Sequence, residues 1–204
     1  CRYNLYDLKK CLNLSMVLPD TCRMEMDGGV EPGINRKIAI FAHLFYEELF
    51  DYCLSYLMPL SSFCDIYITT GTQKSKEILE SRISYNGHVK DIAVSSYTGR
   101  EWAAFLLIDK KYMAEYDYFC LIHDKKSSQM FYPAIGKSFC DNLWENSLKS
   151  VEYVKNIICM FEKNEQIGLF VPPEVYHGTY FHTAIDFWTI CFEGTKKFLE
   201  DNAI

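Results

Sequence analysis

The stretch YDYFCLIHDKKSSQ, residues 116–129, passes from an apolar run directly into charged and hydroxyl side chains. The run 116–123 has the length and composition of a buried strand. It ends in a histidine, an acid, two lysines and two serines, namely His123, Asp124, Lys125, Lys126, Ser127 and Ser128. The question is what such a mixture of charges does at the end of a strand.

Similar apolar runs recur along the chain and alternate with segments of helical periodicity. The predicted strands are residues 37–43, 64–70, 88–96, 116–123 and 167–173. The predicted helices are residues 46–58 (ending before Pro59), 73–83, 99–113, 141–164 and 184–201. Near-continuous apolar strands that alternate with helices predict an α/β fold, with a mostly parallel sheet and helices on both faces.

The composition is that of a folded protein and excludes several classes. The chain has 204 residues, of which 49% are hydrophobic and 16% aromatic, enough for one domain with a sizeable core. Its net charge of −6 argues against a general nucleic-acid binder. No apolar run reaches the roughly 18 residues that cross a membrane. The nine cysteines are scattered without a CxxC pair, so we expect buried, reduced thiols and no zinc site.

Residues 1–36 differ from the rest of the chain. Their apolar spacing is roughly helical up to Pro19, and a turn-rich stretch, MDGGVEPGINR, follows. We predict that residues 1–36 are a linker or extension from a preceding region, and that residues 37–204 are the α/β domain. The chain is expected to be part of a longer protein.

The polar residues that follow the predicted strands are the candidate site, because ligands of open parallel sheets bind beyond the carboxyl ends of the strands. They are His43, Thr69, Thr70, Arg100, His123, Asp124, Lys125, Lys126, Ser127 and Glu174. Two lysines, an arginine, hydroxyls and helix N-termini on one edge would form a cradle for a diphosphate.

Each of these features also has a purely structural explanation. Thr98 and Glu101 fit a capping box, and Lys125 and Lys126 fit a solvated turn. His177 and His182 would be metal ligands or ordinary surface histidines. The sequence has no GxGxxG, no P-loop and no GxSxG motif, which counts against a dinucleotide-binding protein, a kinase and a hydrolase.

Five segments, in this order and spacing, resemble the rhamnan-synthesis F family of bacterial surface-polysaccharide proteins. They are IAIFAHLFYEELFDYCLSYL, DIYITT, TGREWAAFL, YDYFCLIHDKKS and IGLFVPPE, within residues 37–175. IHDKKS resembles the family's His-x-Lys-Lys-Ser signature. TGREWAAF resembles its Asn-x-Gly-Arg-Asp segment, with Tyr97 or a neighbour at the Asn position and Glu101 in place of Asp.

The resemblance implies a nucleotide-sugar-binding domain of the GT-A class. It implies a glycosyltransferase that moves a sugar, expected to be rhamnose from dTDP-rhamnose, onto a growing glycan acceptor in cell-surface polysaccharide synthesis. Other domains of the same protein are its expected partners. A cytoplasmic place, peripheral to the inner face of the cell membrane, is expected because nucleotide sugars are cytoplasmic.

Under this resemblance we assign roles to the strand ends. The donor diphosphate is assigned to Lys125, Lys126, Ser127 and Arg100, and the nucleotide to His43, Thr69, Thr70, Gly99 and Glu101. Asp124 and Glu174 are the predicted catalytic carboxylates, with Asp141 and Asp186 as other candidates for the base.

Either a metal ion or lysine side chains would supply the positive charge that the diphosphate needs. His123 and Asp124 would hold Mg²⁺ or Mn²⁺ on the diphosphate, or Lys125 and Lys126 would replace the metal as fixed positive charge. The second is favoured because two cations repel a metal, so no cofactor is required.

Two further alternatives stay open. One is a non-catalytic glycan- or partner-binding module of a larger polysaccharide synthase, which the missing Asp-x-Asp motif favours. The other is a protein-interaction domain, which the acidic charge and aromatic content allow.

Overall fold

A computed structural model gives the fold of the chain. The structure describes residues 18–19, 22–24, 29, 32–33, 35–83, 88–95, 101–105, 112–126, 133–173 and 197, without the side chains of 133–136. The chain divides into two units, residues 18–173 and residues 1–17 with 174–204, and all the elements described below belong to the first.

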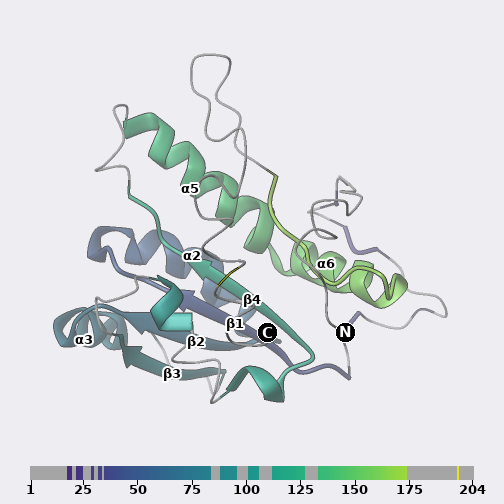
Figure 1. The fold of residues 1–204 in the computed structure, drawn as a ribbon, viewed down its shortest axis with the longest axis horizontal. Helices are drawn as coiled ribbons and strands as arrows, with labels where there is room; N and C mark the ends of the chain where they lie inside the picture. Colours follow the sequence, from purple (N-terminus) through teal and green to yellow (C-terminus); the bar gives the residue numbers. More distant parts are fainter. Residues whose placement is uncertain are drawn as a thin grey trace. The chain divides into compact units, whose positions relative to one another are not determined.

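Four parallel strands form one sheet (Figure 1). They are β1 (Ile38–His43), β2 (Asp65–Thr70), β3 (Val89–Val94) and β4 (Tyr118–His123), in the order β3-β2-β1-β4. The prediction of an α/β fold with a parallel sheet is confirmed.

Helical elements connect and follow the strands. They are η2 (Glu47–Leu49), α2 (Phe50–Leu60), α3 (Gln73–Arg82), η3 (Met113–Glu115), α5 (Pro133–Leu148) and α6 (Val151–Lys163), and residues 101–105 are also helical. Side-chain caps explain where two of them begin. The hydroxyl of Thr72 accepts the Ser75 N–H before α3, and the hydroxyl of Ser150 accepts the Tyr153 N–H before α6.

Three sequence predictions are wrong in detail. The helix predicted to end before Pro59 continues to Leu60, because a proline in the last turn leaves only a local bond unmade. The helix predicted over 141–164 is two helices, since Ser150 is extended and caps α6. Residues 167–173 form no strand; their apolar side chains stay in solvent, with Leu169 78% and Val171 63% exposed.

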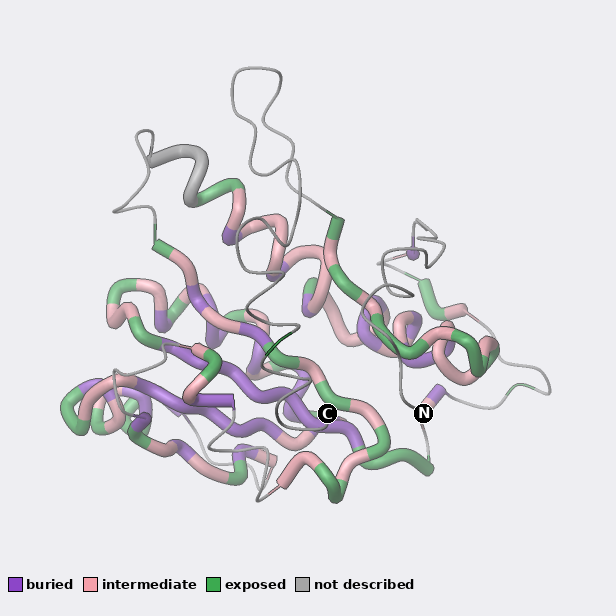
Figure 2. Tube along the Cα trace, viewed as in Figure 1, coloured by how far each residue is buried: buried purple, intermediate pink, exposed green. Residues whose placement is uncertain are grey.

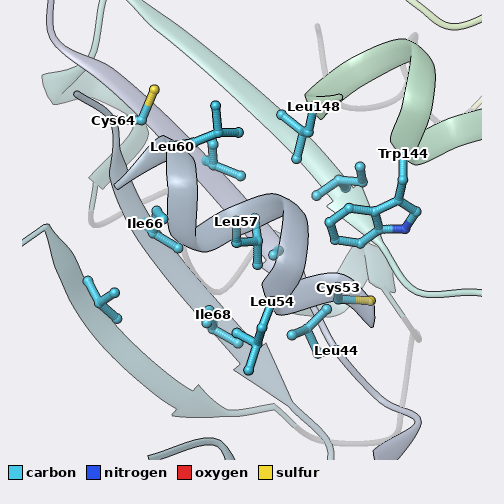
Figure 3. Close-up of a cluster of buried hydrophobic side chains, with 14 of the residues drawn as sticks. Leu44, Cys53, Leu54, Leu57, Leu60, Cys64, Ile66, Ile68, Trp144 and Leu148 are labelled. Carbon is cyan, nitrogen blue, oxygen red and sulfur yellow. The ribbon is translucent and has the colours of Figure 1, made fainter. Parts of the chain in front are cut away.

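Side chains of the strands alternate between two cores. On one face, Ile38, Ile40 and Ala42 of β1 belong to the larger cluster, which includes Leu57 of α2 and Trp144 of α5 (Figure 3). On the other face, Ala39, Phe41 and Tyr67 pack with Tyr112, Met113 and Tyr116. β1 is buried at all six positions, and the buried residues gather in the central strands (Figure 2). This burial explains why β1 reads as a continuous apolar run.

The handedness of the connections decides which core each connection joins. The chain moves in one direction through β1, β2 and β3, so right-handed crossovers put α2 and α3 on the same face. From β3 it returns past β1 to β4, and the described end of this connection, residues 112–116, packs on the opposite face. Leu57 and Leu79 lie accordingly in the larger cluster.

Asn156 on α6 joins the segment before β1 to the unit. Its side chain is fully buried, accepts the Met24 N–H at 2.7 Å and donates to the carbonyls of Pro19 at 2.8 Å and Cys22 at 3.0 Å. The described part of residues 18–36 is therefore tied to α6, whereas the predicted domain boundary at residue 36 stays a prediction.

The described cysteines are free thiols, and most are buried, as predicted. Cys53, Cys64, Cys140 and Cys159 are buried, Cys120 is half-buried and Cys22 is exposed. Among the described residues, no helix combines the length and hydropathy that a membrane crossing requires.

Candidate ligand site at the carboxyl edge of the sheet

The strand order reverses direction between β1 and β4. The first three strands run outward from β1 on one side, and β4 pairs with its other side. In open α/β sheets, the crevice beyond the carboxyl ends of the two strands at such a reversal is the usual place of ligand binding. These ends are His43 of β1 and His123 of β4, whose Cα atoms are register partners.

Three polar side chains form a row across the strand ends. Thr69, His43 and His123 are aligned by the register of β2, β1 and β4, and they lie on the same face of the sheet. The Nδ1 atom of His43 is 2.9 Å from the Thr69 hydroxyl. Thr69 is fully buried and His43 is 7% exposed. The structure thus brings these three predicted residues together at one edge, and their role in ligand binding stays a prediction.

The environment of His43 favours its neutral form. Burial lowers the pKa of His43, and the neighbouring His123 lowers it further, whereas Glu101 raises it. The charge of Glu101, at the start of the helical segment 101–105, therefore acts on His43. A neutral imidazole paired with a hydroxyl can donate or accept hydrogen bonds to a polar ligand.

His123 has a defined tautomer when neutral. Its Nδ1 atom lies 2.8 Å from the backbone carbonyl of Asp124. Because a carbonyl only accepts, Nδ1 carries the proton and Nε2 keeps its lone pair. His123 is half-buried, so solvent still reaches its ring.

Asp124 lies underneath the edge rather than on it. It is 4% exposed, and its Oδ2 atom accepts the backbone N–H groups of Phe45 at 2.8 Å and Tyr46 at 2.7 Å. Its own N–H donates to the His43 carbonyl at 3.1 Å. Burial raises the pKa of Asp124 to about 7, although the backbone N–H groups of Tyr46 and Phe45 oppose the rise.

The two lysines differ in their surroundings. Lys126 is exposed, forms an ion pair with Glu48 and lies over the Tyr46 ring, 5.9 Å from its centroid. The hydrogen bond with Glu48 raises the pKa of Lys126 and lowers that of Glu48. Lys125 is half-buried. Positive charge thus stands beside the reversal point, but Lys126 already contacts a carboxylate, and the binding of a diphosphate by the two lysines stays a prediction.

Thr70 and Asp141 do not join the row. Thr70 faces the larger core, is fully buried, and its hydroxyl has no hydrogen-bond partner among the described residues. Asp141 lies on α5, where its carboxylate accepts from the Tyr52 hydroxyl at 3.0 Å and from Lys137 at 2.5 Å. Thr70 therefore lies in the core, and Asp141 is paired with residues of the helices that cover it.

Several predicted site residues lie outside the described residues. They are Gly99, Arg100, Ser127, Glu174, His177, His182 and Asp186. Within the described part of the chain, no group of three His, Cys, Asp or Glu side chains is arranged to hold a metal. A metal role for His123 and Asp124 stays a prediction, and the Oδ2 atom of Asp124 already has two donors.

The loop after β1 contains residues at the edge that are not among the predicted site residues. Phe45, Tyr46 and Glu48 lie at the carboxyl edge, in contact with Asp124 or Lys126. The signal is present in AHLFYEEL, residues 42–49, which begins with the last two residues of the first strand. It was overlooked because the helix was predicted to begin at residue 46, whereas α2 begins at Phe50.

Comparison with known proteins gives one match. A model of the family described as Rhamnan synthesis protein F matches residues 4–204. Neither the curated proteins nor the solved structures contain a significant match. The matched range includes β1 to β4 and every residue of the row at their carboxyl ends. The chain therefore belongs to the Rhamnan synthesis protein F family.

Proposed function

We propose that this domain is a glycosyltransferase of bacterial surface-polysaccharide synthesis, which moves rhamnose from dTDP-rhamnose to a growing glycan. Family membership supports a role in rhamnan synthesis. The observation that carries the proposal is the row of Thr69, His43 and His123 at the strand-order reversal, with Lys125 and Lys126 next in the chain. It acts in the cytoplasm, at the inner face of the membrane, because its donor is made there.

The donor diphosphate is held by fixed positive charge. Lys125 and Lys126, with Ser127 and Arg100, bind the phosphate oxygens. As the bond to the sugar breaks, negative charge grows on the leaving diphosphate, and lysines already in place stabilise it without reorganisation. No metal is required on this proposal.

The nucleotide lies across the ends of β1 and β2. The His43 imidazole is held near Thr69, and its lowered pKa keeps it neutral. Together with Glu101 and Gly99, these groups supply donors and acceptors for the base or the ribose.

In the chemical step the sugar passes from the nucleoside diphosphate to an acceptor hydroxyl. An acceptor hydroxyl oxygen bonds to the anomeric carbon, the bond between that carbon and the phosphate oxygen breaks, and the nucleoside diphosphate leaves with the electron pair. The hydroxyl proton passes to a base. Within the proposal two groups fit this role: Glu174, outside the described residues, and the Nε2 atom of His123.

A non-catalytic module is the second candidate. It is favoured by the contact of Lys126 with Glu48, which places a carboxylate of the protein where the proposal places a phosphate. Such a module would bind glycan or a partner domain without binding a donor.

Donor binding tests the proposal. We would titrate the chain with dTDP, UDP, GDP and their sugars by ligand-detected NMR, with and without Mn²⁺. The proposal expects metal-independent binding of a thymidine donor, lost in a Lys125→Ala, Lys126→Ala double variant. A Lys149→Ala, Lys163→Ala variant, which removes the same charge from exposed positions before α6 and at its end, should bind normally. Absence of binding to every donor would overturn the proposal in favour of the non-catalytic module.

A further inference from the structure

The segment that connects β1 to α2 rests on a buried carboxylate. This β1–α2 loop, residues 44–49, passes over the end of β4. Two successive backbone N–H groups, those of Phe45 and Tyr46, donate to one oxygen of Asp124 at 2.8 and 2.7 Å. Both bonds are charge-assisted when the carboxylate is ionised, which makes them stronger than bonds between neutral groups.

The burial of Asp124 also indicates that its carboxylate holds the loop. Only 4% of the residue is exposed, and a carboxylate is removed from water at a large cost unless hydrogen bonds compensate it. Here the compensating donors belong to the protein backbone. The side-chain contacts that the structure gives this carboxylate are therefore contacts with the loop.

The β1–α2 loop carries side chains that do face the edge. The Phe45 ring is 39% exposed, and its centroid lies 6.4 Å from that of His43. The Tyr46 ring lies beneath Lys126, and Glu48 forms an ion pair with that lysine. The orientation of all three side chains depends on the path of the loop that Asp124 holds.

We propose that Asp124 is a positioning residue: it fixes the β1–α2 loop across the strand-order reversal, and through the loop sets Phe45, Tyr46 and Glu48 around His43 and Lys126. Asp124 then touches neither donor nor metal. The ligand-binding consequence rests on the proposed function, whereas the fixing of the loop does not.

Two variants separate positioning from direct contact. In Asp124→Asn the amide oxygen has two lone pairs and can accept both N–H groups, but the negative charge is lost. In Asp124→Ala both N–H groups lose their acceptor. Positioning predicts that Asn restores what Ala removes, whereas a metal-ligand or general-base role predicts that both variants fail.

Amide hydrogen exchange provides a readout that needs no ligand. We expect the amides of Phe45 and Tyr46 to remain protected in wild type and in Asp124→Asn, and to exchange at least about tenfold faster in Asp124→Ala. Asp51→Ala removes an exposed carboxylate from α2 and should leave both amides protected. Equal protection in wild type and Asp124→Ala would overturn the proposal.

Donor titration provides the second readout. Binding of dTDP-rhamnose is expected within about threefold of wild type in Asp124→Asn and weaker by about tenfold or more in Asp124→Ala. If Asp124→Asn loses binding while its two amides stay protected, Asp124 contacts the ligand and the proposal is wrong. If wild type binds no donor, the proposed function fails, and the exchange experiment still decides the role of Asp124. Because Asp124→Asn keeps the hydrogen bonds, the test stands even where Asp124→Ala does not fold.

Discussion

Lys126, which follows β4, is ion-paired with Glu48, which follows β1, so one salt bridge joins the two loops that flank the strand-order reversal. The same lysine lies over the ring of Tyr46. Both charged side chains are about half exposed (45% for Lys126 and 52% for Glu48), so solvent and salt can compete with the pair. The lysine is held, but not buried, at the place where the proposed diphosphate would lie.

Glu48 competes with an anionic ligand for Lys126. We therefore expect Glu48→Gln to bind the nucleoside diphosphate several-fold more tightly than wild type, because the lysine no longer has to release a carboxylate. Titration of dTDP at low and at physiological salt measures this. Glu47→Gln is the matched control: it lies on the same turn but pairs with Lys74 and Ser75, so its affinity should not change. Weaker binding in Glu48→Gln would mean that Glu48 itself contributes to the ligand site.

The tautomer of His123 allows an isosteric test of the base. In His123→Asn the amide N–H can replace the Nδ1–H donor to the Asp124 carbonyl, while Nε2 disappears. If His123 takes the acceptor proton, donor binding should persist and transfer should fall by about a hundredfold or more. Separate measurements of donor affinity and of turnover check this. The control is His88→Asn, because His88 pairs with Asp65 at the start of β2. Full turnover in His123→Asn would leave the role to Glu174.

The sheet was predictable because its strands carry the signal locally. β1 is buried on both faces and therefore reads as an unbroken apolar run, and hydroxyls and histidines mark the strand ends at Thr69, His43 and His123. The order of the strands, by contrast, is not encoded locally. The pairing of β4 with β1 rather than β3 depends on long-range packing that no single segment encodes.

Two predicted site residues, Asp124 and Thr70, face protein for a common reason. The prediction places each polar residue after a strand beside a ligand, but the sequence does not tell whether such a residue faces solvent or protein. Asp124 turned out to be buried beneath the β1–α2 loop, and Thr70 faces the larger core. The apolar stretch 167–173 fails for the converse reason, because Leu169 is hydrophobic but exposed. Burial is a tertiary property, and only the fold assigns it.

Asn156 should be essential for the docking of the segment before β1. Its side chain satisfies three backbone groups, those of Met24, Pro19 and Cys22. Replacing it by alanine leaves them without partners at a buried site, and we expect the free energy of unfolding to fall by about 3 kcal/mol. Urea denaturation measures the change. Glu165→Ala, at an exposed position beyond the same helix, should have little effect. A loss below about 0.5 kcal/mol would show that these backbone groups find water instead.

Asp124 should make stability depend on pH in an unusual direction. Its pKa rises from the ordinary 3.8 to about 7 in the folded protein, chiefly through burial. Between about pH 4 and pH 7 the folded state therefore keeps a proton that the unfolded state has released, so stability falls as the pH rises through this window. The difference corresponds to at most about 4 kcal/mol. His43 acts in the opposite sense, because a lowered pKa costs stability as the pH falls below its ordinary 6.5.

Urea denaturation from pH 4 to pH 8 would separate the two contributions. In Asp124→Asn the fall with rising pH should vanish, which leaves the rise due to His43, with Glu48 and Glu152 adding to it at the acid end. In Thr69→Val, which removes the hydroxyl partner of His43, the part due to Asp124 should remain. The same pH dependence in wild type and in Asp124→Asn would show that the carboxylate is ionised throughout, held by the N–H groups of Phe45 and Tyr46 more firmly than burial opposes. In that case the two hydrogen bonds, rather than desolvation, dominate the electrostatics beneath the β1–α2 loop.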